Sequence, residues 1–154
     1  MTAEAIEFDR SLLGVEHRVG TFNITREAIL AFCEAVGDSN PLFTDREAAR
    51  AAGHDDIIAP PTFCTAFNPR MGFPDLKLEF PGVNLLAGQA VESLAPIKPG
   101  DTLTATTVLK EVYSKTGRSG TMVFWTWETR YTNQDGVIAA KSQQSFVRRG
   151  RGVE

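Results

Sequence analysis

The feature that most constrains the fold is a change in hydrophobic periodicity near residue 81. Before it, apolar residues recur at helical spacing, and after it they alternate with polar residues at every second position. One face of the segment 123–131 carries Val123, Trp125, Trp127 and Tyr131. The other face carries Thr126, Glu128 and Arg130. Turn signals at 98–101, 115–117 and 133–136 divide the second half into four strands of about ten to fifteen residues.

The first half of the chain is predicted to contain one strand and several helices. We expect a strand over 15–24, followed by a helix over 25–36 that begins at the N-cap residue Thr25 and ends at Gly37. Further helices are predicted over 45–52 and 61–67, with a long loop over 68–82. One strand and an apolar helix followed by four long strands predict an α+β fold, in which a long antiparallel sheet surrounds a buried helix.

The length of the chain predicts a single domain. Its 154 residues match the usual size of one domain, so we expect one domain over 1–154, with flexible ends at 1–14 and 150–154. Cys33 and Cys64 lie in apolar surroundings with no close paired spacing, which favours reduced, buried thiols.

The charge of the chain limits its partners. A formal net charge of -3 excludes an overall positive field that would attract nucleic acid or an anionic membrane. We interpret the basic run Arg148, Arg149 and Arg151 as a solvated end. No apolar stretch approaches the roughly 20 residues needed to cross a bilayer, and residues 1–10 lack the pattern of a secretory signal. The expected protein is cytoplasmic and binds neither nucleic acid nor membrane.

Three motifs resemble those of MaoC-like (R)-specific enoyl-CoA hydratases and 3-hydroxyacyl dehydratases. They are AVGDSNPLF at 35–43, IIAPPTF at 57–63 and PIKPGD at 96–101. The resemblance extends from about residue 15 to residue 149. It implies a hot-dog fold, a role in fatty acid metabolism, and the addition of water to an enoyl thioester or the reverse elimination. The substrate would be an acyl-CoA or an acyl-carrier thioester, and no cofactor is implied.

The family's catalytic residues match this sequence only in part. In the family, an Asp and a His five residues later share the water, and a backbone amide at the start of the central helix polarises the thioester carbonyl. Asp38 occupies the first place, with Asn40 in the same motif. Phe43 stands where the His is expected and cannot transfer a proton. Pro60 aligns with the glycine that supplies the amide, and proline has no N–H.

These substitutions leave more than one interpretation open. They resemble a degenerate half found in some MaoC-like dehydratases, which binds the acyl chain while a partner hot-dog carries the Asp and the His. The chain would then form a homodimer or a heterodimer with a second hot-dog subunit. Alternatively, it is a self-sufficient hydratase that uses Asp38 with or without His54, or, with less support, a hot-dog acyl-CoA thioesterase. Asp38 also has a structural interpretation, since Asp residues often cap their own turns.

The resemblance also places the substrate. An acyl tunnel would run beside the central helix, and the expected substrate-binding residues are Phe43, Pro60, Thr62, Phe63, Phe67, Met71 and Phe73. Thr62 or Phe63 would supply the missing amide donor. Trp125 and Trp127 are interpreted as core or interface residues, with tunnel lining as the alternative. His54 precedes two aspartates that would favour its charged form, but it also suits an exposed loop. Dispersed His and Cys residues give no spacing for a metal site.

Overall fold

The computed structural model describes residues 5–150 and has an α+β architecture. Its helices are the 3-10 helix η1 (Arg10–Leu12), the α-helices α1 (Arg26–Val36), α2 (Pro41–Thr44) and α3 (Arg46–Ala51), and the 3-10 helix η2 (Phe63–Arg70). Its strands are β1 (Glu16–Asn23), β2 (Val83–Ser93), β3 (Thr102–Gly117), β4 (Gly120–Thr132) and β5 (Ile138–Arg149). Among these described elements, no helix is long and apolar enough to cross a membrane.

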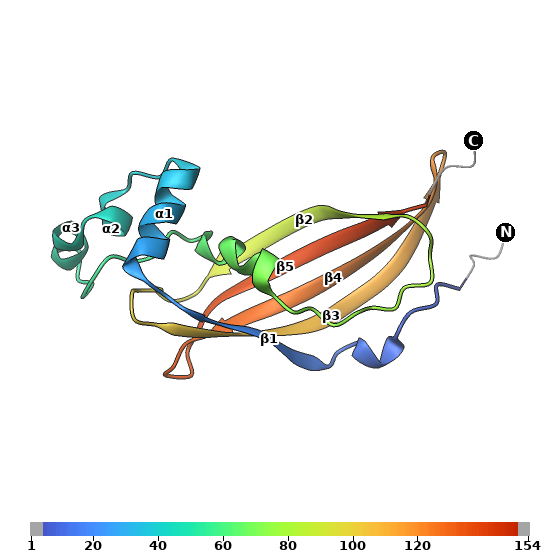
Figure 1. Cartoon of the computed structure of the whole chain (residues 1–154), viewed down its shortest axis with the longest axis horizontal. Helices are drawn as coiled ribbons and strands as arrows, with labels where there is room; N and C mark the ends of the chain where they lie inside the picture. Colours follow the sequence, from blue (N-terminus) through green and yellow to red (C-terminus); the bar gives the residue numbers. More distant parts are fainter. Residues whose placement is uncertain (1–4, 151–154) are drawn as a thin grey trace.

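The five strands form one antiparallel sheet in the order β1-β3-β4-β5-β2. The predicted strands are therefore confirmed, and the first runs from Glu16 to Asn23. Strands β1 and β2 are consecutive in the chain but form opposite edges of the sheet, so the segment between them crosses from one edge to the other (Figure 1). This crossing segment carries most of the candidate site residues.

Helix α1 begins and ends where its sequence predicts. The Thr25 hydroxyl accepts a hydrogen bond from the Ala28 N–H at 3.1 Å, and Gly37 ends the helix in the left-handed conformation with φ 72°. Only Ile29 and Cys33 of this helix are buried. Figure 1 shows α1, α2 and α3 gathered at one end of the sheet, so α1 is not the helix that the sheet surrounds.

The helix against the inner face of the sheet is η2. The green segment that lies over the sheet in Figure 1 contains it, and Phe63, Cys64 and Phe67 are its buried side chains. The sequence predicted an α-helix over 61–67, whereas the structure has a 3-10 helix from Phe63 to Arg70. The 3-10 helix begins two residues later than predicted, after the prolines at 60 and 61, and it includes Pro69, which cannot donate a backbone hydrogen bond.

The core has two clusters of buried residues. The larger one lies around η2 and α1, and the smaller one contains Leu12, Leu76, Leu78, Leu109, Val123, Trp125 and Trp127. The apolar residues of the predicted loop 68–82 cover the smaller cluster, because Leu76 and Leu78 are buried there.

Both ends of the described chain make contacts with this second cluster. In the expected flexible end 1–14, the described part forms η1, and the Asp9 N–H donates to the Leu76 carbonyl at 2.9 Å. At the other end, the half-buried Arg148 donates to the carbonyls of Leu78 and Phe80 at 2.8 and 3.1 Å. A solvated end is therefore the wrong interpretation for Arg148. Residues 1–4 and 151–154, including Arg151, lie outside the described residues.

Candidate functional site

Asp38 lies in the turn between α1 and α2, where its carboxylate has a structural partner. Its backbone N–H donates to the Cys33 carbonyl at 2.9 Å, which continues the C-terminal turn of α1. Its Oδ1 accepts the Asn40 N–H at 3.0 Å. The Asn40 side chain in turn accepts the Leu42 N–H at 3.1 Å and caps α2. Asp38 therefore caps its own turn, as its structural interpretation predicts.

The position of the missing histidine is filled by a core residue. Phe43 is 8% exposed and belongs to the larger core cluster. Pro60 is also buried, and its carbonyl accepts the Phe63 N–H at 2.9 Å. The Phe63 amide is thus already occupied. The Thr62 N–H has no hydrogen bond among residues 5–150, so it is the one of the two expected donors that stays open.

His54 lies beside a different, polar cavity. This cavity has a volume of about 330 Å³, and its wall includes His54, Asp55, Asp56, Lys98, Asp101 and Asp135 but not Asp38. The structure therefore does not bring the two expected catalytic residues to one cavity. Asp101 is buried in the wall and accepts hydrogen bonds from the Lys98 N–H and the Gln134 amide, both at 3.0 Å, so it holds the turn before β3.

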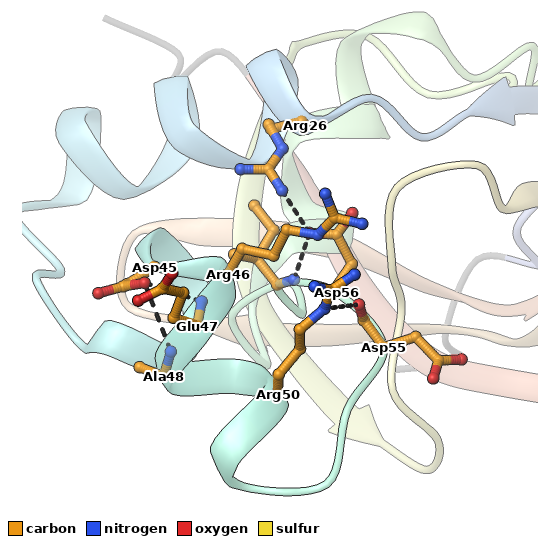
Figure 2. A network of polar contacts seen from close by, with 9 residues as sticks. Arg26, Asp45, Arg46, Glu47, Ala48, Arg50, Asp55 and Asp56 are labelled. Carbon is orange, nitrogen blue, oxygen red and sulfur yellow. Dashed lines mark hydrogen bonds and ion pairs between the residues drawn. The ribbon is translucent and has the colours of Figure 1, made fainter.

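The two aspartates after His54 take part in an ion-pair network (Figure 2). Asp56 pairs with Arg26 of α1 at 2.5 Å and with Arg46 of α3 at 3.9 Å, and it accepts the Ile57 N–H. The Asp55 carbonyl accepts a hydrogen bond from Arg50, while its carboxylate points away from the network in Figure 2. These contacts tie the 54–57 loop to α1 and α3. Within residues 5–150, no three His, Cys, Asp or Glu side chains group to hold a metal ion.

The aromatic residues expected to line the acyl tunnel pack against one another. Phe67 stacks on Phe22 with ring centroids 4.3 Å apart, and Phe63 meets Phe67 edge to face at 5.4 Å. Met71 accepts a weak hydrogen bond from the Tyr131 hydroxyl at 3.8 Å. Together with Phe43 these side chains form part of the larger core cluster. This arrangement makes them a packed core in the single chain.

An open apolar groove lies farther along the inner face of the sheet. It has a volume of about 290 Å³ and runs between the segment 73–76 and strands β2, β4 and β5. Its apolar wall consists of Phe73, Leu76, Leu86, Trp125, Trp127 and Phe146, with Leu85 and Pro74 beside them. Of the expected tunnel residues, Phe73 lines this groove. The two tryptophans are therefore both core residues and part of a cavity wall.

Apart from Phe73 and the tryptophans, the residues of this groove were not among the expected site residues, because the turn residues of segment 68–82 predict a loop. A signal was present in the sequence, since Leu76, Leu78 and Phe80 are apolar residues within that loop. A loop with such residues covers part of a core.

Neither thiol has the environment of a nucleophile. Cys33 and Cys64 are both free and buried, as predicted. Burial raises the pKa of Cys64 from 9.0 to about 12. Burial and the nearby charge of Asp38 raise the pKa of Cys33. Both groups are therefore protonated at neutral pH, and a protonated thiol is a poor nucleophile.

Comparison with known proteins identifies relatives of this chain. The family model of the FAS1-like dehydratase domain region matches residues 11–142. A UPF0336 protein from Streptomyces coelicolor is 37% identical over 115 residues, which cover 71% of this chain and 76% of the relative.

Solved structures identify the fold. A MaoC-like dehydratase from Rhodospirillum rubrum superposes with a TM-score of 0.72 and 24% identity, covering 96% of this chain and 99% of that chain. The HadBC complex, a 3R-hydroxyacyl-ACP dehydratase from Mycobacterium tuberculosis, gives a TM-score of 0.71 and 23% identity, covering 88% of this chain and 96% of that chain. The hot-dog fold implied by the sequence motifs is confirmed.

Proposed function

The chain belongs to the family of the FAS1-like dehydratase domain region, and from this premise we propose that it is the acyl-binding subunit of a two-subunit dehydratase. The enzyme interconverts an enoyl thioester and a 3-hydroxyacyl thioester by moving water. This chain holds the acyl group, and a partner hot-dog supplies the catalytic His. The proposed protein acts in the cytoplasm, in fatty acid metabolism, and needs no cofactor beyond the CoA or carrier protein of its substrate.

The observation that carries the proposal is the burial of Phe43. The family's chemistry needs a group at this position that accepts or donates a proton, and a phenyl ring does neither. The Phe43 side chain is packed in the larger core cluster, so it does not swing aside to let a proton-transfer group from elsewhere in the chain occupy its position. Losing one acid or base typically costs about 100- to 10,000-fold in rate, which a partner's intact site would avoid.

Two further features of the site support a binding role. Asp38 already accepts the Asn40 N–H, and His54 lines a cavity that Asp38 does not reach. The self-sufficient mechanism with both residues requires them to act on one water, and they share neither of the cavities described above. In the version with Asp38 alone, the carboxylate would act while it also accepts the Asn40 N–H.

The open edge of the sheet supports assembly with a second hot-dog. Strand β2 pairs only with β5, and its apolar residues Val83, Leu85 and Leu86 are each more than half exposed. An exposed apolar edge strand tends to pair with another strand. The HadBC structure, a complex by its name, has the same fold, which makes pairing with a different hot-dog subunit the version we propose.

The test compares the single chain with a heteromer. The chain is purified alone and also co-expressed with a hot-dog protein of the same genome that retains the Asp and His pair. Each preparation is assayed for hydration of crotonyl-CoA and dodecenoyl-CoA. We expect turnover by the heteromer only. Asp38→Asn in this chain should leave the heteromer within about twofold of wild type, whereas loss of the partner's His should cost at least about 100-fold.

The opposite pattern would overturn the proposal. If the purified chain hydrates these substrates by itself and Asp38→Asn abolishes the turnover, the chain is a self-sufficient hydratase. Phe43→Leu is the matched control, because it keeps the position apolar and without a proton-transfer group. It should leave heteromer turnover largely intact.

A further inference from the structure

We infer that the groove between residues 73–76 and the sheet, not the aromatic cluster around η2, binds the distal alkyl segment of a long-chain acyl thioester. This inference rests on the proposed function, since it assigns a place to the acyl chain that the subunit is proposed to hold. In the single chain, Phe43, Phe63, Phe67 and Met71 fill the expected tunnel with packed side chains. The groove offers space that is already open, and its wall is mostly apolar, although Asp75, Asn84 and Arg148 also line it.

The volume of the groove selects the part of the ligand that fits. Pockets for small molecules usually measure about 300–1,000 Å³, and this groove measures about 290 Å³. It therefore takes a segment of an alkyl chain but not a whole acyl thioester with its carrier arm. The reacting thioester then lies outside the groove, as a catalytic site in a partner subunit requires.

The walls of the groove are held in place by contacts that do not involve the ligand. Phe73 packs on Trp127 with ring centroids 5.6 Å apart, and Trp125 stacks on Phe146 at 5.7 Å. Arg148 donates to the carbonyls of Leu78 and Phe80, which fixes the covering segment to β5. A site formed in advance lowers the entropic cost of binding a flexible chain.

The groove reaches the edge of the sheet where the partner is proposed to bind. Leu86 lines the groove, lies on edge strand β2 and is 55% exposed. An alkyl chain that extends from a partner's catalytic site can therefore enter past Leu86 without crossing the packed core. Because the groove reaches the proposed interface, we expect its ligand to be an acyl chain that comes from the partner, and not an unrelated apolar molecule.

The two tryptophans allow a direct test, because both tryptophans of the chain, Trp125 and Trp127, line the groove. The probe is the CoA thioester of bromoundecanoic acid, with bromine on the terminal carbon. Bromine quenches tryptophan emission only at near-contact distance. We expect saturable quenching by this probe and none by undecanoyl-CoA or free CoA. Equal responses to the brominated and unbrominated thioesters would overturn the inference.

Variants locate the binding. Leu86→Glu and Phe73→Asp place a charge on opposite walls of the groove, and each should weaken probe binding by at least about tenfold, because the bound alkyl chain would displace water from that charge without solvating it. Leu94→Glu is the matched control, since Leu94 is 46% exposed and is not part of the groove wall. Light scattering on each variant records its oligomeric state. Binding as tight as wild type in both groove variants would contradict the inference.

A second assay separates this inference from the proposed function. In the active heteromer, Phe73→Asp should lower kcat/KM for dodecenoyl-CoA by at least about tenfold more than for crotonyl-CoA, because the short chain does not reach the groove and Phe73 is not on the edge strand β2. A heteromer that loses no long-chain activity in this variant removes the groove assignment and leaves the subunit role intact. A heteromer without activity on either substrate, formed from wild-type subunits, removes the subunit role itself.

Discussion

At the scale of single residues, several carboxylate, phenol and thiol groups that could take part in catalysis have structural roles instead. The carboxylate of Asp38 caps its turn, and Asp56 bridges two arginines. Tyr131 is fully buried, and burial raises the pKa of its phenol to about 12. Cys64 is held in the same way, with its thiol protonated inside the core. The titration of these buried residues is therefore expected to change the stability of the fold, and not the rate of a reaction.

The pKa of Cys64 predicts a loss of stability in alkaline solution. Its folded-state pKa of about 12 lies above 9.0, the ordinary value of a cysteine thiol, so the folded state keeps a proton that the unfolded chain loses. The stabilising contribution is complete below pH 9.0 and declines as the pH rises toward 12, by roughly 1.4 kcal/mol per pH unit. Urea unfolding between about pH 8 and pH 10 measures this decline.

Cys64→Ala should show a shallower decline over the same range, although it starts from a lower stability. Val123→Ala is the control, because Val123 is fully buried and carries no titratable group. It should lose stability while keeping the pH dependence of the wild type. Identical slopes for wild type and Cys64→Ala would contradict the prediction.

At the scale of helices and strands, what the sequence predicted correctly depends on local interactions. Thr25 caps α1, and Asp45 caps α3 through hydrogen bonds to residues two and three positions later. Strand alternation in β4 likewise follows from the pleat of a single strand. Helix η2 was predicted less well, because the position of this segment depends on contacts with a distant sheet.

The candidate site shows the same division between local and distant contacts. The motif turn at Asp38 follows from neighbouring residues and was expected. The groove requires that segment 73–76 meet β2, β4 and β5, which are distant in the sequence. Neither periodicity nor a turn signal encodes such a meeting. The packing of Phe43 and Phe67 in the core, where open tunnel walls were expected, likewise depends on how much space the folded chain leaves.

The C-terminal end of α1 gives a prediction at this scale. Gly37 has a φ of 72°, and no atom lies within 4 Å of the place where a Cβ would stand. A side chain there would therefore strain the backbone without colliding with a neighbour. Gly37→Ala should lower the free energy of unfolding by about 1 kcal/mol. Gly117→Ala is the control, since a Cβ at this position would also have no neighbour within 4 Å and the φ of Gly117 is not in the left-handed region. Urea unfolding of both variants tests this, and equal stabilities would contradict it.

At the scale of the whole molecule, the sheet has two unlike edges. Strand β1 has two buried residues, Val19 and Phe22. Among residues 5–150, strand β2 has no further strand beyond it, and ten of its eleven residues are exposed. The proposed assembly therefore uses the β2 edge. The groove reaches that same edge through Leu86.

Assembly through β2 can be tested with charge. The sample is the heteromer of the proposed function. Val83→Lys combined with Leu85→Lys in this chain should reduce its molar mass, measured by light scattering, toward the masses of the separate subunits, because lysine on an edge strand opposes pairing. The fold should persist, since both positions are more than half exposed. Val137→Lys is the control, because Val137 is 46% exposed in the turn between β4 and β5. An unchanged mass in the double variant would show that another surface mediates assembly.

The order of the strands has a consequence for biosynthesis. Strand β2 has a single neighbour, β5, and β5 is the last strand to leave the ribosome. Translation at about 5–20 residues per second therefore leaves the leucines of β2 without a cognate strand until nearly all of the sheet has been made. In that interval a nascent chain is open to chaperones and to edge pairing with other polypeptides. A partner subunit translated nearby would meet the finished β2 edge only after β5 has docked.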